Sequence, residues 1–254
     1  MCGRYTLFLE RGNLEECFDA RFPDDDSFEP RYNVSPGQRL PVITHDEPGA
    51  FQRLEWGLRP AWADEETSGI INARAETVAE KRSFRTAYAL KAGDESSGSG
   101  ARRLASGRCL VPANGFYEWV ETDAGKQPYR VAFADDRPFA MAGLWERWKP
   151  ERETTQTGLE SFGGGTSDAA DDPEPDVIET FTVVTTEPNA VVDDLHNRMA
   201  AILEPAHERE WLTADDPAGL LEPYPAEEMR AYPVSAAVNS PSVDEPSLVE
   251  PLEG

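Results

Sequence analysis

The stretch at residues 108–119, RCLVPANGFYEW, shows how the chain is expected to fold. Two apolar, strand-like runs lie on either side of Asn114-Gly115, a dipeptide typical of tight β-hairpins. In the second run, the period-two alternation of a strand puts Phe116 and Glu118 on one face and two other aromatic residues on the opposite face. A glutamate flanked by large aromatic residues is unusual on a solvated face, and burial there would raise its pKa. The alternative is an edge strand that leaves Glu118 at the surface.

Similar short runs recur along the chain, separated by turn-forming residues. Strands are expected at 40–44, 51–56, 129–133, 139–145, 181–186 and 232–234. Helices are expected at 13–22, with Asn13 as the cap, and at 84–90, 188–195, 208–212 and 217–221. No internal repeat or linker divides the chain, so we expect one α+β domain over residues 1–238. Composition predicts flexible insertions at about 91–101 and 150–176 and a disordered acidic tail over 239–254.

The charge of the chain is strongly unbalanced. It has 48 acidic and 24 basic residues, a net charge of -24, and only four lysines. Such a surface suits molar salt, where screening limits self-repulsion, so the composition favours a halophilic protein over an acidic interaction protein. The charge also weighs against nucleic acid as a partner unless arginines gather locally, because non-specific affinity comes mainly from neutralising phosphates.

The cysteines and the amino-terminal sequence bear on where the protein works. Cys2, Cys17 and Cys109 are too few and too scattered for a disulfide framework, and they form no zinc motif. We therefore expect a reducing compartment, no metal and no cofactor. The chain shows no signal-peptide pattern and no apolar run long enough for a membrane span, so we expect a cytoplasmic protein.

The first five residues, Met1-Cys2-Gly3-Arg4-Tyr5, hold a candidate nucleophile. Removal of Met1 would leave Cys2 at the amino terminus, with an amine and a thiol on adjacent carbons. An α-amine with a pKa of about 7.7–8.0 is partly neutral at physiological pH, and nearby positive charge favours the thiolate. The default interpretation is an ordinary buried cysteine, and the rest of the chain decides between the two.

Two further segments bring polar side chains to the ends of apolar runs. Asn72 and Arg74 lie two residues apart after an apolar pair, so a strand would point both to the same side. His196 and Arg198 have the same spacing at the start of another apolar run. A lone histidine is usually structural, but an arginine so close makes His196 a candidate site residue.

These motifs carry a resemblance to a known family. With Met1–Tyr5, NARAE at 72–76, GFYEW at 115–119 and HNRM at 196–199 in this order, the chain resembles the SRAP family of SOS response-associated peptidases. The resemblance covers about residues 1–238 and implies a mixed fold with a β-barrel-like core and a positively charged groove. It also implies a monomeric sensor that crosslinks through Cys2 to abasic sites in single-stranded DNA of the nucleoid. Peptidase action on Met1 and lyase character belong to the same expectation.

The resemblance assigns roles to individual residues. Glu118 would handle protons at the amine and the imine, His196 would assist opening of the sugar ring, and Asn72 would orient the Cys2 amine. The residues expected to clamp flanking phosphates are Arg4, Arg74 and Arg198. The residues expected to form walls for unpaired bases are Trp56, Pro36 and Met199.

Two positions depart from the family pattern, and one other function competes. Asn197 stands where the family commonly has Asp, and Ala200 where it often has Pro; Asn197 argues against a role for a second carboxylate beside His196. The alternative is an N-terminal-nucleophile amidohydrolase of the glutaminase type, which also begins Met-Cys-Gly. Such domains usually feed a synthetase partner domain and lack the three downstream motifs.

Overall fold

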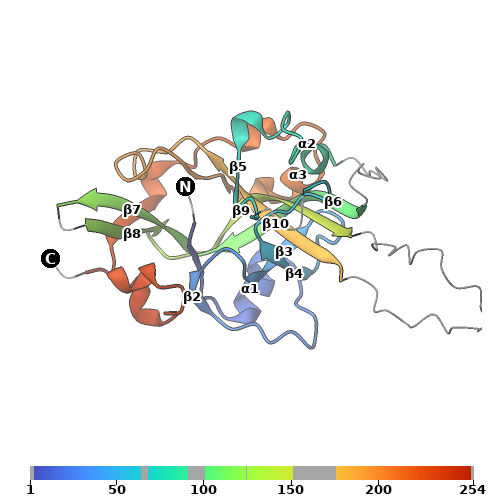
Figure 1. Ribbon diagram of the computed structural model, residues 1–254. Coiled ribbons are helices and arrows are strands. Elements are labelled where there is room, and N and C mark those ends of the chain that lie inside the picture. The colour runs from blue at the N-terminus through green and yellow to red at the C-terminus, as the bar shows by residue number, and fades with distance from the viewer. Residues whose placement is uncertain (1–2, 64–67, 91–100, 124, 151–175, 253–254) are drawn as a thin grey trace, which may run out of the picture.

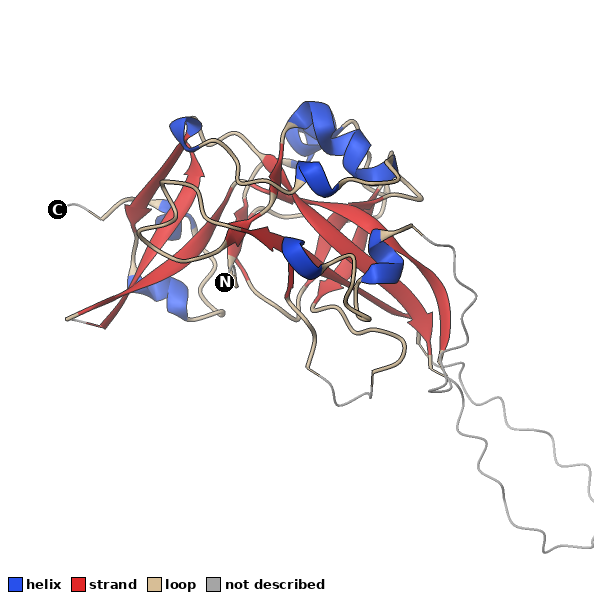
Figure 2. Cartoon of the chain, turned by 90° about the horizontal axis from the view of Figure 1, so that it is seen from above, coloured by secondary structure: helices blue, strands red, loops and turns tan. Residues whose placement is uncertain are grey.

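The computed structural model describes residues 3–63, 68–90, 101–123, 125–150 and 176–252. Within them, the strands form a closed barrel and a five-stranded sheet that extends away from it (Figures 1 and 2). The helices of this part of the chain are short and lie around the strands. The expected α+β fold with a barrel-like core is therefore confirmed.

Five strands close the barrel. Around it they are β10 (Ile178–Thr186), β4 (Phe51–Trp56), β3 (Arg39–Thr44), β6 (Arg102–Ala113) and β9 (Phe139–Lys149). Closure follows because β9 pairs with both β6 and β10. Three short strands extend this sheet: β5 (Asn72–Arg74) and β11 (Met199–Ala200) pair with β10, and β12 (Ile202–Leu203) pairs with β9. The predicted strands at 40–44 and 51–56 match β3 and β4 to within one residue.

The second sheet carries the start of the chain. Its strands, in order, are β13 (Met229–Pro233), β8 (Gly125–Phe133), β7 (Gly115–Thr122), β1 (Tyr5–Leu7) and β2 (Arg31–Val34), all antiparallel. Phe116 joins the main hydrophobic core, whereas Tyr117 joins a separate cluster with Val234, Val238 and Leu248. The predicted alternation of faces along β7 is confirmed.

The expected hairpin at Asn114-Gly115 is wrong. The chain crosses there from the barrel to the second sheet, so β6 pairs with β3 and β9, while β7 pairs with β1 and β8. Gly115 is not among the glycines with positive φ. A Cβ at this position would lie 2.8 Å from the carbonyl oxygen of Val131, so the glycine permits close approach of two strands and not a turn.

The helices differ in their bounds from those expected. Helix α1 (Arg11–Phe18) begins earlier than predicted, because Glu10 and not Asn13 stands at its amino-terminal cap, and it ends at Asp19 in the left-handed conformation. Helices α2 (Arg85–Tyr88) and α3 (Glu208–Thr213) lie within or near predicted segments, whereas 188–195 forms turns. The 3-10 helices are η1 (Ala75–Thr77), η2 (Pro205–His207), η3 (Ala218–Leu220), η4 (Ala226–Glu228), η5 (Ala236–Asn239) and η6 (Pro246–Val249).

The segment after residue 238 is ordered as far as residue 252, so the expected disorder is wrong there. It contains η6, and the side chain of Leu248 is fully buried beside Tyr117. The Tyr117 hydroxyl donates to the carbonyl of Tyr32 at 2.8 Å and lies 3.4 Å from that of Leu248. The composition of this segment, rich in Pro, Ser and Glu, gave no sign that one apolar side chain and several polar groups bind it to the rest of the protein.

Other expectations meet the limits of the described residues. The predicted insertions at 91–101 and 150–176 lie almost wholly outside them. In the part of the chain that the structure describes, no helix is long and apolar enough to cross a membrane.

Candidate functional site

Strand β1 sets the start of the chain beside Glu118. Tyr5 pairs with Phe116, and the backbone N–H of Tyr117 donates to the carbonyl of Arg4 at 3.0 Å. Continued by two residues, this register would bring Gly3 level with Glu118. Cys2 itself lies outside the described residues, but its Cα can be only about 3.8 Å from that of Gly3.

Glu118 is a buried carboxyl group. Its side chain lies on β7 opposite Tyr129 of β8, and the residue is only 2% exposed. Burial raises the pKa of the Glu118 carboxyl to about 7, although the positive charge of the amino terminus lowers it in part. The alternative of a surface residue on an edge strand is therefore wrong. A carboxyl group with a pKa near neutrality can both accept and donate a proton at physiological pH.

The ring of His196 lies against the backbone of Arg198. Its Nδ1 lies 3.0 Å from the backbone N–H of Arg198 and 3.2 Å from the carbonyl oxygen of the same residue, so it accepts from the first in one tautomer and donates to the second in the other. Burial lowers the pKa of His196, and the positive charge of the amino terminus lowers it further. The pKa values of His196 and Glu118 thus both respond to the charge of the terminal amine, which here belongs to Met1 and not to Cys2, although 78 residues separate them in the sequence.

The NARAE and HNRM motifs meet at the end of β10. In parallel pairing, Asn72 lies opposite Val183 and Arg74 opposite Thr185. Arg198 reaches the same place, because its Nη2 donates to the carbonyl of Thr185. The fold therefore brings together two polar motifs that the sequence shows only as separate segments.

Two of the three candidate phosphate-binding arginines already have protein partners. Arg198 forms a bidentate ion pair with Glu76. The hydrogen bond from Arg198 is the main cause of the lowered pKa of Glu76. Arg4 donates through Nη1 to Asn33 Oδ1 and to the carbonyl of Val238, both at 2.8 Å. Arg74 is exposed. Sequence reasoning gave no role to Glu76 or Asn33, and the only signal for Glu76 was its place in the NARAE motif.

The three expected base-stacking residues differ in exposure. Trp56 is 1% exposed, and its ring lies in the core 5.2 Å from that of Tyr5. Met199 is fully buried, and its sulfur accepts the backbone N–H of Asn189. Neither presents a face to solvent in this structure. Pro36 is exposed on the turn after β2, where Gly37 N–H donates to the carbonyl of Trp56 at 2.8 Å.

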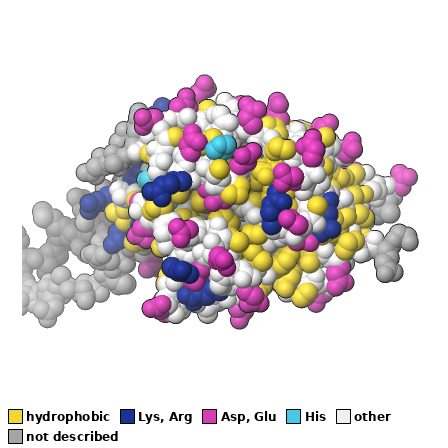
Figure 3. Space-filling model, turned by 180° about the vertical axis from the view of Figure 1, so that it is seen from behind, with side chains coloured by type: hydrophobic (Ala, Val, Ile, Leu, Met, Phe, Trp, Pro, Cys, Tyr) yellow, Lys and Arg dark blue, Asp and Glu magenta, His cyan; other side chains and the backbone are white. Residues whose placement is uncertain are grey.

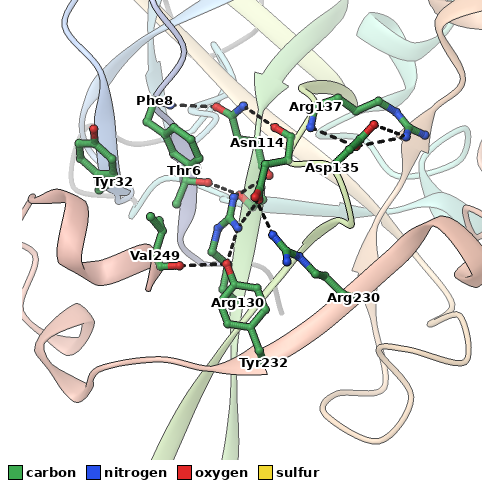
Figure 4. Close-up of polar contacts among 12 residues, drawn as sticks. Thr6, Phe8, Tyr32, Asn114, Arg130, Asp135, Arg137, Arg230, Tyr232 and Val249 are labelled. Atoms are coloured by element: carbon green, nitrogen blue, oxygen red, sulfur yellow. Dashed lines mark hydrogen bonds and ion pairs between the residues drawn. The ribbon is translucent and has the colours of Figure 1, made fainter. Parts of the chain in front are cut away.

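A buried polar cluster fixes the other end of β1 (Figure 4). Phe8 N–H donates to Asn114 Oδ1 at 2.9 Å, and Arg130 Nη2 donates to the Asn114 carbonyl at 3.0 Å. Arg130 is 1% exposed, and its Nη1 contacts Asp136 at 2.7 Å and the Tyr232 hydroxyl at 2.6 Å. Strand β1 is therefore anchored at the end away from Cys2 as well as near it.

The surface charge is mixed. On the face seen in Figure 3, acidic side chains are scattered among fewer basic ones. The described residues contain no group of three or more His, Cys, Asp or Glu that could hold a metal ion. A positively charged groove stays a prediction, and near the candidate site it depends on Arg74 together with arginines that are already paired.

Comparison with known proteins gives consistent matches over the whole chain. The family profile described as SOS response associated peptidase (SRAP) matches residues 1–92 and 95–241. The abasic site processing protein YoqW of Bacillus subtilis is 38% identical over 98% of this chain and 99% of its own length. The abasic site processing protein YedK of Escherichia coli is 27% identical over 99% and 100%. A crystal structure of a protein from Bacteroides thetaiotaomicron superimposes with a TM-score of 0.74 at 26% identity, covering 99% of this chain and 100% of that one.

Proposed function

The chain belongs to the family of SOS response associated peptidases (SRAP), and on that premise we propose that it captures abasic sites in single-stranded DNA covalently through Cys2. The names of its relatives support abasic sites as the target. The observation that favours covalent capture most is the pairing of β1 with β7, which starts the chain beside the buried Glu118. In this proposal the protein acts as a monomer on the DNA of the nucleoid.

The chemistry needs an amine and a thiol on one residue. Once Met1 is removed, the neutral Cys2 amine attacks the aldehyde of the ring-opened abasic sugar, and loss of one water gives an imine. The Cys2 thiol then adds across the carbon–nitrogen double bond: sulfur bonds to carbon, and the nitrogen regains a proton. In the resulting five-membered thiazolidine, both the nitrogen and the sulfur of Cys2 are bonded to the former aldehyde carbon. These two bonds make the adduct durable.

The proton transfers fall to the two groups whose pKa values respond to the amino terminus. Glu118, with a pKa of about 7, takes the proton that the amine loses and returns one to the departing hydroxyl as water. His196, whose pKa burial lowers, assists opening of the sugar ring. Asn72, on β5 opposite Val183 of β10, orients the amine. The same groups would serve peptidase action on Met1, and the imine stage would account for lyase character.

Phosphate contacts would come from the arginines near the end of β10. Arg74 is exposed and is the strongest candidate. Arg198 must first give up part of its ion pair with Glu76, so its contact with phosphate is a competition between two anions. Pro36 remains a candidate to face an unpaired base, because it is the exposed member of the three expected stacking residues.

The direct experiment uses single-stranded DNA with one abasic site, incubated in high salt and separated on a denaturing gel. We expect a heat-stable adduct that Cys2→Ala abolishes, and that Glu118→Gln or His196→Asn slows by about a hundredfold. Intact DNA without the lesion is the control. Absence of an adduct from protein shown to lack Met1 would refute covalent capture, and release of ammonia from glutamine would favour the amidohydrolase.

A further inference from the structure

The carboxyl-terminal segment lies against the start of the chain. We call residues 236–252 the C-terminal strap. The carbonyl of Val238 accepts from Arg4, and Asp244 Oδ1 accepts the backbone N–H groups of Tyr32 at 2.6 Å and Asn33 at 3.0 Å. Trp119, on the strand that carries Glu118, donates through Nε1 to Asn239 Oδ1 at 2.7 Å. The strap therefore contacts Arg4, which precedes β1, and the strands β2 and β7.

Asn33 joins the strap to Arg4, the residue before β1. Its Oδ1 accepts from Arg4 Nη1 at 2.8 Å, and its Nδ2 lies 2.9 Å from the carbonyl of Ser240 and 2.7 Å from that of Val243. The residue is fully buried. A side-chain amide has one oxygen and two N–H donors. Here the oxygen accepts a hydrogen bond from Arg4, and the N–H groups donate to carbonyls of the strap. Burial leaves no water to replace a lost partner, so each contact is costly to break.

We propose that Asn33, together with the C-terminal strap, is a positioning residue for the amino-terminal nucleophile, which presupposes the proposed capture of aldehydes by Cys2. Arg4 is two residues from Cys2, and its backbone carbonyl is bonded to Tyr117, the neighbour of Glu118. When Asn33 and Val238 hold the Arg4 side chain and Met1 has been removed, only two residues, Cys2 and Gly3, lie beyond this fixed point. A terminus without such an anchor samples many positions, and few of them put the amine at the carboxyl group.

This role differs measurably from the phosphate clamp expected for Arg4. A clamp contributes to affinity for DNA and to its salt dependence, since each phosphate contact adds to the slope of log K against log salt. A positioning contact contributes to the rate of capture once DNA is bound. Loss of a phosphate clamp is therefore expected to raise the dissociation constant and leave the saturated rate unchanged. Loss of a positioning contact is expected to lower the saturated rate and leave the dissociation constant unchanged.

The test uses the full chain and two kinds of single-stranded DNA. Adduct formation is timed at saturating DNA with a natural abasic site, and affinity is measured with an unreactive reduced abasic analogue. For Asn33→Ala we expect the saturated rate to fall at least about tenfold while the dissociation constant stays within about threefold. Arg4→Gln, a change at a less buried residue, is expected to give the same division. Weaker binding with an unchanged saturated rate would overturn the proposal in favour of the phosphate clamp.

Gln127→Ala is the matched control. Gln127 Nε2 also donates to a carbonyl next to the strap, that of Val234 at 2.9 Å, but it does not contact Arg4. We expect its saturated rate to equal that of the wild type, and equal slowing by this variant would refute a specific role for Asn33. Failure of the wild type to react would instead refute the proposed function. The positioning role alone fails when the wild type reacts and both Asn33→Ala and Arg4→Gln match it.

Discussion

At the scale of single residues, Glu118 couples function to stability. Burial raises its folded pKa to about 7 from an ordinary value of 4.5. Between these values the unfolded chain has released a proton that the folded protein still binds, so stability falls as pH rises through this window and stays low above it. The buried carboxyl group of Glu118 thus lowers the free energy of unfolding at neutral pH.

Glu118→Gln should remove that cost. The substitution keeps the shape of the side chain but cannot ionise, so we expect a gain of about 1–3 kcal/mol in unfolding free energy near pH 8 and little change near pH 4. Urea unfolding at the two pH values measures it. Glu121→Gln, on the exposed end of the same strand, should show no such pH dependence. A Glu118 variant whose effect is the same at both pH values would contradict the assigned pKa.

Glu76 restrains Arg198 by their ion pair, and its removal should release the arginine for phosphate. We expect Glu76→Gln to bind single-stranded DNA several-fold more tightly, with a salt slope steeper by about 0.7 for one added contact. Titration over a range of salt concentrations measures both quantities. Glu80→Gln makes the same charge change at an exposed position nearby. If Glu80→Gln gives an equal gain, net charge and not Arg198 is responsible.

At the scale of elements, β3, β4 and the alternation along β7 could be predicted because local patterns determine them. Phe116 and Tyr117 face different clusters, as period two requires. The crossing at Asn114-Gly115 could not be predicted, because the glycine is needed for contact with Val131 on another strand. Long-range partners of this kind have no local signal in one sequence.

The candidate site was predicted in part for the same reason. Glu118 and His196 stood out by their neighbours, but the flanking aromatic residues left burial or exposure of Glu118 open, and the structure shows it buried. Asn33 gave no signal, since its partners Arg4 and Val238 are 29 and 205 residues away. The resemblance made Trp56 a candidate wall for unpaired bases, but its side chain is buried in the core.

The order of the C-terminal strap can be tested through Leu248. This side chain is fully buried in the small cluster with Tyr117, Val234 and Val238. Leu248→Ala is therefore expected to lower the unfolding free energy by about 2–4 kcal/mol, by loss of apolar contact and creation of a cavity. Urea denaturation measures the loss, with the exposed Leu252→Ala as control. An unchanged midpoint would mean that the strap does not pack in solution.

At the scale of the whole molecule, the net charge of -24 should make stability depend on salt. Raising the salt from about 0.1 M to about 1 M shortens the Debye length from about 10 Å to about 3 Å, which weakens repulsion among the acidic side chains. We expect the melting temperature to rise over this range in KCl. A melting temperature that falls or does not change would argue against a salt-adapted surface.

The two sheets carry different residues of the candidate site. Asn72 and Arg74 lie on β5, which pairs with barrel strand β10, and His196 lies shortly before β11, which pairs with the same strand. Glu118 lies on β7 of the second sheet. Strand β1 lies in the second sheet, and its residues Tyr5 and Leu7 belong to the main core. The strand that follows the first residues is thus held by both sheets.

The mass of the purified adduct tests covalent capture by Cys2 most directly. We predict the mass of the chain without Met1 plus that of the oligonucleotide, minus one water. After denaturation the adduct should take up one fewer thiol-alkylating group than the free protein, because only Cys17 and Cys109 keep free thiols. Attachment at another residue, or full alkylation of all cysteines in the intact adduct, would contradict thiazolidine formation at Cys2.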